Sequence, residues 1–289
     1  MTTTPSSRAT PASTDASVPS PLVGEGQGGG DSRPSKAGVP PTPNPSPQGG
    51  GELGRREGIR RGFDRTHTWI FDLDNTLYPA DCALFTQVDR RMGEFIARYL
   101  GVPFEYARHL QKTYYRQFGT TLSGLMQVHK MDPQAFLDYV HDIDLSVVAA
   151  HPELAQAIAA LPGRKLIFTN GSCAHAERVA RKLGIFDLFE DTFDIVKAGY
   201  VPKPSPACYD QFLKDHGVQA PEAAMFEDMP HNLEAPHALG MTTVLVRSDF
   251  NYDHPVQKAI RAWLEPPEHV HHMTDDLAGF LLGIRPPSA

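Results

Sequence analysis

The stretch WIFDLDNTLYP, residues 69–79, decides the fold because an apolar run ends there in two acidic residues. The run from Trp69 to Phe71 is wholly apolar, which is typical of a strand buried on both faces of a parallel sheet. Asp72 and Asp74 stand two residues apart, so their charges repel each other, and a buried carboxylate is costly to ionise. A strand with only a structural role would not end this way. The ending therefore indicates a functional site.

Residues 1–62 differ in composition from the rest of the chain. They are rich in Pro, Ser, Thr and Gly, and such a segment cannot bury enough apolar area to offset its conformational entropy. We therefore predict a disordered tail. The expected boundaries are this tail, a core domain at 63–80 and 161–289, and a helical cap domain at 81–160.

Composition also limits which kinds of partner the protein could bind and in which cellular compartment it could act. The net charge of −7 and the pI of about 6.0 argue against bulk nucleic acid or a membrane surface as a partner. The three cysteines, Cys82, Cys173 and Cys208, form no CxxC pair, which favours a reducing compartment. The sequence lacks an apolar run of roughly 18 residues and the apolar core of a signal peptide. We expect a soluble cytoplasmic protein and leave the oligomeric state open.

Strand patterns alternate with helical patterns from Thr66 onward. Strands are expected at residues 66–74, 164–171, 191–196, 223–228, 242–248 and 269–273. Helical stretches of about 10 to 15 residues separate the later strands, which predicts an α/β fold with a Rossmann-like parallel sheet. The long stretch from 81 to 160 has only helical patterns, so we expect an inserted all-helical domain after the first strand.

Polar residues follow several of these strands. Thr169 and Asn170 end the second strand, Glu227 and Asp228 end a later one, and Lys203 lies in the loop VPKPSP. Ligands of open parallel sheets bind beyond the carboxyl ends of the strands, where these residues would meet Asp72 and Asp74. The sequence therefore predicts one site at this edge of the sheet.

The residue types at this edge point to phosphoryl chemistry. Several carboxylates need a cation, and an oxygen-rich site suits Mg²⁺. With the cation holding Asp72 ionised and Asp74 keeping its proton, the first can attack phosphorus and the second can serve as general acid and base. Lys203, the Thr169 hydroxyl and backbone N–H groups would stabilise the charge of the transferring group.

Four motifs in this order resemble the haloacid dehalogenase (HAD) superfamily of hydrolases. They are DLDNT at 72–76, TN at 169–170, Lys203 within KP, and EDMPHN at 227–232, and the resemblance covers about residues 66–284. The helical insertion resembles the C1 cap of subfamily IA. The strings FDLDNTLYP, YYRQFGTTLSGLM and FTNGSCAHAERVARKLGIFDLF resemble the pyrimidine 5′-nucleotidase branch, whose members remove the 5′-phosphate of UMP or CMP.

The resemblance assigns roles by position. Asp72 matches the nucleophile and Asp74 the general acid and base, while Thr169 and Lys203 match the phosphate-binding hydroxyl and lysine. Asp72, the Asp74 backbone carbonyl and Asp228 match the Mg²⁺ ligands, and Glu227 stands where many relatives have Asp. The remaining matches are Asn232, which steadies the lysine or a metal-bound water, and Asn75 and Asn170, whose backbone N–H groups would cradle phosphate.

Alternatives remain for the substrate and for the class of protein. Another small phosphate ester, such as a sugar phosphate or a lysophosphatidate, would suit the same core chemistry. A haloacid dehalogenase needs no acid for its leaving group, so Asp74 argues against it. A non-catalytic binding protein would not need the full set of motifs. Tyr114, Tyr115 and Phe118 of the insertion are expected to pack in its core, with stacking on a substrate base as the alternative.

Overall fold

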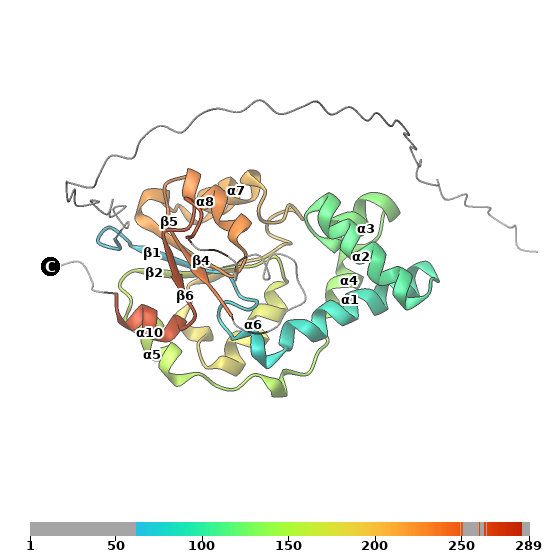
Figure 1. Cartoon of the computed structure of the whole chain (residues 1–289), viewed down its shortest axis with the longest axis horizontal. Helices are drawn as coiled ribbons and strands as arrows, with labels where there is room; N and C mark the ends of the chain where they lie inside the picture. Colours follow the sequence, from blue (N-terminus) through green and yellow to red (C-terminus); the bar gives the residue numbers. More distant parts are fainter. Residues whose placement is uncertain (1–61, 249, 251–259, 261–262, 264, 285–289) are drawn as a thin grey trace, which may run out of the picture. The chain divides into compact units, whose positions relative to one another are not determined.

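The computed structural model describes residues 62–248, 250, 260, 263 and 265–284 (Figure 1). The expected tail, residues 1–62, lies outside the described residues except for Gly62. None of the described helices combines the length and apolar composition that crossing a bilayer requires.

A parallel sheet of six strands forms the centre of the described part of the chain. The strands lie in the order β3-β2-β1-β4-β5-β6, and every neighbouring pair is parallel. They are β1 (Thr68–Phe71), β2 (Arg164–Phe168), β3 (Asp191–Phe193), β4 (Ala223–Glu227), β5 (Thr242–Val246) and β6 (His272–Thr274). This is the Rossmann-like α/β fold that the sequence predicts, with the strand order reversing between β1 and β4.

Each face of the sheet is covered by helices (Figure 1). Along β1, Trp69 and Phe71 join one hydrophobic cluster and Ile70 joins the other, as the two-residue period of a strand requires. The first cluster includes residues of α5 (Pro152–Ala160), α6 (Cys173–Leu183) and α10 (Leu277–Leu282). The second includes residues of α7 (Pro206–His216) and packs against α8 (Glu234–Ala238).

Four helices between β1 and α5 form what we call the helical insertion. They are α1 (Leu84–Leu100), α2 (Phe104–Phe118), α3 (Thr121–His129) and α4 (Pro133–His141). Successive contacts join α1 to α2 and α4, and α2 to α3. The fifth helix of the expected cap range, α5, packs instead against α10, so this part of 81–160 lies with the sheet.

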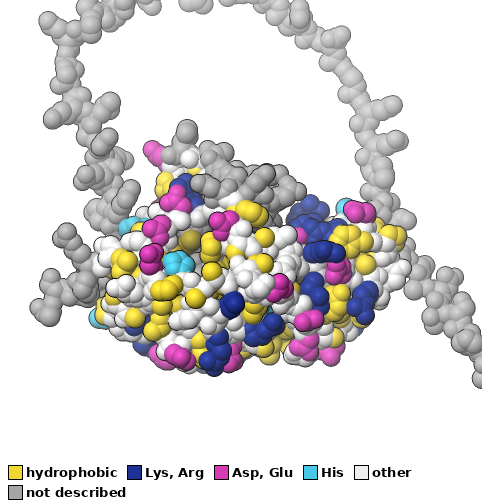
Figure 2. Space-filling model, turned by 90° about the horizontal axis from the view of Figure 1, so that it is seen from below, with side chains coloured by type: hydrophobic (Ala, Val, Ile, Leu, Met, Phe, Trp, Pro, Cys, Tyr) yellow, Lys and Arg dark blue, Asp and Glu magenta, His cyan; other side chains and the backbone are white. Residues whose placement is uncertain are grey.

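The helical insertion carries an excess of positive charge. Within residues 84–141 the sequence has seven Lys and Arg residues and five Asp and Glu residues, although the whole chain is acidic. Figure 2 shows Lys and Arg side chains, with some acidic ones among them, on the side of the molecule where the insertion lies. A local surplus of positive charge raises the concentration of anionic ligands near this surface.

Two glycines with positive φ offer a matched test of the backbone packing at the start of β2. Gly163 has φ of 77°, and a Cβ there would overlap the carbonyl oxygen of His67, which accepts the Arg164 N–H at 2.9 Å. Gly184 has φ of 79°, and a Cβ there would meet nothing within 4 Å. The left-handed conformation costs any other residue about 1–2 kcal/mol at both positions.

We therefore expect Gly163→Ala to lower the free energy of unfolding by at least about 1 kcal/mol more than Gly184→Ala does. Urea denaturation of the two variants measures the difference. Equal losses would show that the His67 carbonyl moves aside without cost.

Candidate active site

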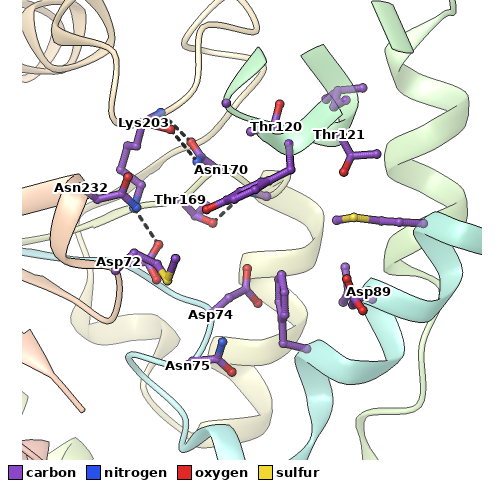
Figure 3. A pocket seen from close by; sticks show the side chains of 18 of the residues that line it. Asp72, Asp74, Asn75, Asp89, Thr120, Thr121, Thr169, Asn170, Lys203 and Asn232 are labelled. Carbon is purple, nitrogen blue, oxygen red and sulfur yellow. Dashed lines mark hydrogen bonds and ion pairs between the residues drawn. The ribbon is translucent and has the colours of Figure 1, made fainter. Parts of the chain in front are cut away.

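The expected site residues meet at the carboxyl ends of β1, β2 and β4, where the strand order reverses. They line a cavity of about 190 Å³ that also receives residues from all four helices of the insertion. Figure 3 shows Asp89, Thr120 and Thr121 of the insertion across this cavity from Asp72 and Lys203. All nine residues proposed from the sequence line the cavity: Asp72, Asp74, Asn75, Thr169, Asn170, Lys203, Glu227, Asp228 and Asn232.

A buried lysine organises the floor of the cavity. Lys203 is 1% exposed, and its Nζ donates to Asp72 Oδ1 at 2.7 Å, Glu227 Oε1 at 2.7 Å and the Phe168 carbonyl oxygen at 2.8 Å. Burial acts to lower the pKa of Lys203, but the two carboxylates outweigh burial and raise it. The ammonium therefore stays charged and joins the ends of β1, β2 and β4.

Glu227 accepts hydrogen bonds through both of its carboxylate oxygens. Its Oε1 accepts from Lys203 and from Asn232 Nδ2, each at 2.7 Å, and its Oε2 accepts the Met229 N–H at 2.8 Å. Glu227 thus holds Lys203 in place, and Asn232 steadies the lysine through Glu227. These contacts give Glu227 a role in positioning Lys203, in addition to any contact with a metal ion.

The acids at the floor fit a divalent cation. Carboxylate oxygens of Asp72, Glu227 and Asp228 lie within 4.8 Å of one another, and all three residues are buried. Burial and the neighbouring acids raise the pKa of Asp72 to about 7 and that of Asp228 well above its ordinary value. Among the described residues, Asn232 Oδ1 is buried without a partner, which suits a metal-bound water. Hard oxygen donors in this number fit Mg²⁺.

The second motif is locked onto the loop of Lys203. Asn170 Oδ1 accepts the Lys203 N–H at 2.9 Å, and Asn170 Nδ2 donates to the Lys203 carbonyl oxygen at 3.2 Å. Thr169 is 1% exposed, and its Oγ1 accepts the Gly171 N–H at 2.9 Å. Asn75 adopts a left-handed conformation with φ of 60° at the turn after β1. Asn170 thus serves through its side chain, a role that the sequence did not predict.

Asp74 has different partners from Asp72. Its Oδ1 accepts from Tyr78 Oη at 2.6 Å and contacts His175 Nε2 at 3.0 Å. Burial acts to raise the pKa of Asp74, but the His175 ring and the hydrogen bonds from His175 and Tyr78 outweigh it and hold the pKa below its usual value. Without a cation, the carboxyl pKa of Asp74 therefore lies below that of Asp72, whereas the expected order was for the site with a cation beside Asp72. The sequence could not show this because both donors come from outside the motifs.

Three site residues were missed from the sequence: Tyr78, His141 and His175. His175 stands three positions after the Ser172 cap of α6, on the same face as Ala176 and Val179, so a histidine on an apolar helix face was the available signal. His141, the last residue of α4, stacks on His175 with ring centroids 4.3 Å apart and planes 9° apart. Burial, aided by His175, lowers the pKa of His141 to about 3.

Of the three aromatic residues Tyr114, Tyr115 and Phe118, only Tyr115 lines the cavity. Burial together with the charges of Asp228 and Glu227 raises the pKa of Tyr115 to about 12. Tyr114 instead packs in the insertion and contacts His129 Nε2 at 2.6 Å, while Phe118 packs against Tyr114. The expectation of packing is therefore confirmed for Tyr114 and Phe118 but not for Tyr115.

One known protein family matches most of the described part of the chain. The family model of the haloacid dehalogenase-like hydrolases matches residues 66–240, more than half of the chain. The curated protein "Phosphate metabolism protein 8" of Saccharomyces cerevisiae is 26% identical over 204 residues, 64% of this chain. The match spans 63% of the length of that relative.

Two solved structures are similar in their arrangement of elements. L-2-haloacid dehalogenase from Xanthobacter autotrophicus is 17% identical with a TM-score of 0.46, and the match covers 76% of this chain and 100% of that one. A HAD phosphatase from Thermococcus onnurineus is 14% identical with a TM-score of 0.49, and the match covers 76% and 99%.

Removing the buried ammonium should be far more damaging than removing a surface one. We expect Lys203→Met to lower the free energy of unfolding by about 3–5 kcal/mol, since Asp72 and Glu227 stay buried without their cation. Lys197→Met is the matched control, because Lys197 pairs with Asp191 at 2.8 Å on the surface and such pairs contribute at most about 1 kcal/mol. Urea denaturation in EDTA compares the two, and losses of similar size would contradict the central role of Lys203.

Proposed function

Because the chain belongs to the haloacid dehalogenase-like hydrolases, we propose that it is a Mg²⁺-dependent phosphomonoesterase that forms an aspartyl phosphate on Asp72. One observation carries the proposal: the two carboxylates of the DLD motif have separate partners. Asp72 is paired with Lys203, and Asp74 is held by Tyr78 and His175. This separation supplies a nucleophile and a general acid and base in one cavity.

The reaction divides between these two residues. Asp72 attacks phosphorus, the ester P–O bond breaks, and the leaving oxygen takes a proton from Asp74. Asp74 then takes a proton from the water that attacks the acyl phosphate, which releases phosphate and restores Asp72. The negative charge of the bound phosphoryl group disfavours ionised Asp74, so substrate binding favours the protonated form that the first step needs.

The chain also provides the groups that bind the transferring phosphoryl group. Lys203 contributes a fixed positive charge beside Asp72, and Thr169 lies buried at the same floor. Asp72, Asp228 and the Asp74 backbone carbonyl would hold the Mg²⁺, with Glu227 close enough to assist. The cation, when bound, neutralises the clustered carboxylates and the charge of the phosphoryl oxygens.

For the substrate we propose a pyrimidine nucleoside 5′-monophosphate, UMP or CMP. The insertion lines the cavity with Phe85, Met92, Tyr115 and Phe136, and apolar walls of this kind suit a planar base. Thr120 and Thr121 line the same cavity. Their hydroxyls already donate to Ser123 Oγ and the Gln111 carbonyl oxygen, so they would accept hydrogen bonds from a polar edge of the base. The basic surface of the insertion supports a small anionic ester as the partner. A sugar phosphate or a lysophosphatidate remains the alternative.

A panel of phosphate esters tests the reaction and the substrate together. We expect phosphate release from UMP and CMP in Mg²⁺, none in EDTA, and a loss of at least about 10³-fold in Asp72→Asn, because the nucleophile is removed. Asp191→Asn, a change in a surface ion pair, is the control and should retain activity. Turnover that survives EDTA or Asp72→Asn refutes the mechanism. Activity on glucose 6-phosphate or lysophosphatidate but not on UMP or CMP refutes only the nucleotide assignment.

Cation binding can be measured without turnover. Mg²⁺ at about 100 times its dissociation constant should stabilise the folded chain by about 2.7 kcal/mol, which corresponds to a rise in Tm of about 5–10 °C. Asp228→Asn should abolish the rise because it removes one of the clustered carboxylates. Asp191→Asn should keep it. A rise of equal size in Asp228→Asn would place the cation elsewhere.

A further inference from the structure

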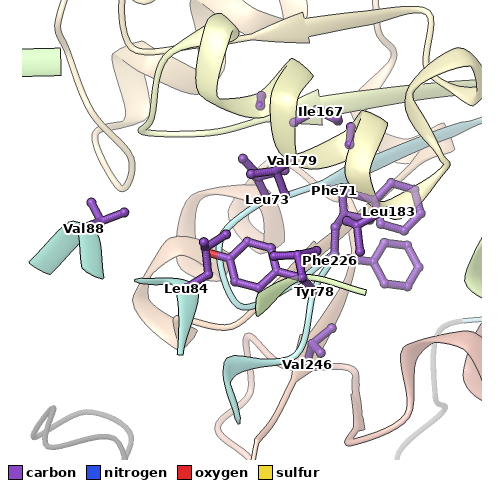
Figure 4. Close-up of a cluster of buried hydrophobic side chains, with 14 of the residues drawn as sticks. Phe71, Leu73, Tyr78, Leu84, Val88, Ile167, Val179, Leu183, Phe226 and Val246 are labelled. Atoms are coloured by element: carbon purple, nitrogen blue, oxygen red, sulfur yellow. The ribbon is translucent and has the colours of Figure 1, made fainter. Parts of the chain in front are cut away.

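Two hydrogen-bond partners fix the carboxylate of Asp74 on one side. Tyr78 Oη and His175 Nε2 both contact the same oxygen, Oδ1, at 2.6 and 3.0 Å. Oδ2 carries neither of these bonds, and Asp74 itself lines the cavity. Figure 4 shows the Tyr78 ring beside Leu84 in the hydrophobic cluster, and Tyr78 is only 1% exposed, so its ring is held firmly. The direction of the Asp74 carboxylate is therefore set by two side chains outside the four motifs.

The His175 ring is itself fixed by the end of the helical insertion. It is 1% exposed and stacks face to face on His141, where α4 ends. His141 Nδ1 contacts Ser172 Oγ at 3.0 Å. The Arg178 guanidinium donates to the His141 carbonyl oxygen at 2.9 Å. These contacts join the end of α4 to the first turns of α6 and leave the ring of His175 little freedom.

The hydrogen bonding of His175 indicates that it is more than a packing residue. Within the described part of the chain, its Nδ1 is buried without a hydrogen-bond partner. An unpaired buried polar atom is unfavourable, and an apolar side chain at this position would fill the same space without that loss. The link from Nε2 to Asp74 is what the histidine adds.

We infer that His175 is a positioning residue that aims Asp74 at the oxygen of the leaving group, with His141 holding the His175 ring. The inference rests on the proposed phosphatase function. His175 transfers no proton: the proton moves from Asp74 to the leaving oxygen as the P–O bond breaks. A general acid acts only within hydrogen-bond reach of that oxygen, and a small displacement sharply lowers its contribution.

The choice of leaving group separates this role from a structural one. An alkyl phosphate needs a proton on its leaving oxygen, whereas 4-nitrophenolate departs without one. We expect His175→Phe, which keeps a stacked ring but removes the N–H, to lower kcat/KM for the best alkyl phosphate about 10- to 100-fold more than for 4-nitrophenyl phosphate. The ratio of the kcat/KM values for the two esters, measured on one sample, does not depend on the fraction of enzyme that is folded.

Further variants make the result specific. His175→Gln retains an N–H donor and should recover part of the lost ratio. His141→Ala removes the stack and should shift the ratio in the same direction by a smaller factor. His216→Phe is the matched control, because His216 also contacts a carboxylate, Asp191 at 3.1 Å, and packs on Phe212, away from the cavity. It should leave the ratio unchanged.

Each outcome decides one claim. Equal losses on both esters in His175→Phe, or an unchanged ratio in His141→Ala if His175→Phe does not fold, would overturn the positioning role. A wild-type chain that hydrolyses neither ester in Mg²⁺ would instead refute the phosphatase function. A large shift in the ratio for Asp74→Asn but none for His175→Phe would support Asp74 as the general acid and refute the positioning role of His175.

Discussion

The buried ammonium of Lys203 is the interaction on which the rest of the site depends. It lies between Asp72 and Glu227 and also binds the last carbonyl of β2, so one charged group joins three strand ends. A buried charge is tolerated only when it is paired and hydrogen-bonded, and each of these partners meets that need for the others. The Asn170 amide holds the backbone of the same lysine from both sides. The floor of the cavity is therefore a closed network, with the remaining excess of acid left for a cation.

The two acids of the opening stretch occupy different environments although they are only two residues apart. Alternation along a strand would send both side chains to the same face, because residues i and i+2 share a face. The strand ends at Phe71, however, and the chain turns at Asp74 and Asn75, which takes the second carboxylate in a different direction. Asp72 thus faces Lys203 and the acid cluster, while Asp74 meets Tyr78 and His175. The helical insertion covers both and contributes His141 behind His175. Closing the cavity and orienting the acid thereby involve the same end of α4.

Much of the fold could be predicted because its signals are local. Apolar runs ending in polar residues located the strands, and alternation of strands and helices indicated the parallel sheet. The structure differs from the sequence-based expectation where long-range packing sets the position of an element. Helix α5 has the same kind of pattern as the insertion but packs on α10, since an amphipathic face does not specify its partner. The strand expected at residues 269–273 begins only at His272, where pairing with β5 starts.

The sequence by itself determined which side chains stand at the strand ends, since strand polarity and the rule for parallel sheets bring Asp72, Thr169 and Asp228 to one edge. Only the tertiary structure decided how the two carboxylates differ. Asp74 and His175 are separated by 101 positions in the chain, and their 3.0 Å contact depends on how α6 and α4 pack against the turn after β1. Protonation depends on burial and on the charges within a few ångströms, and those neighbours are set by packing rather than by spacing along the chain.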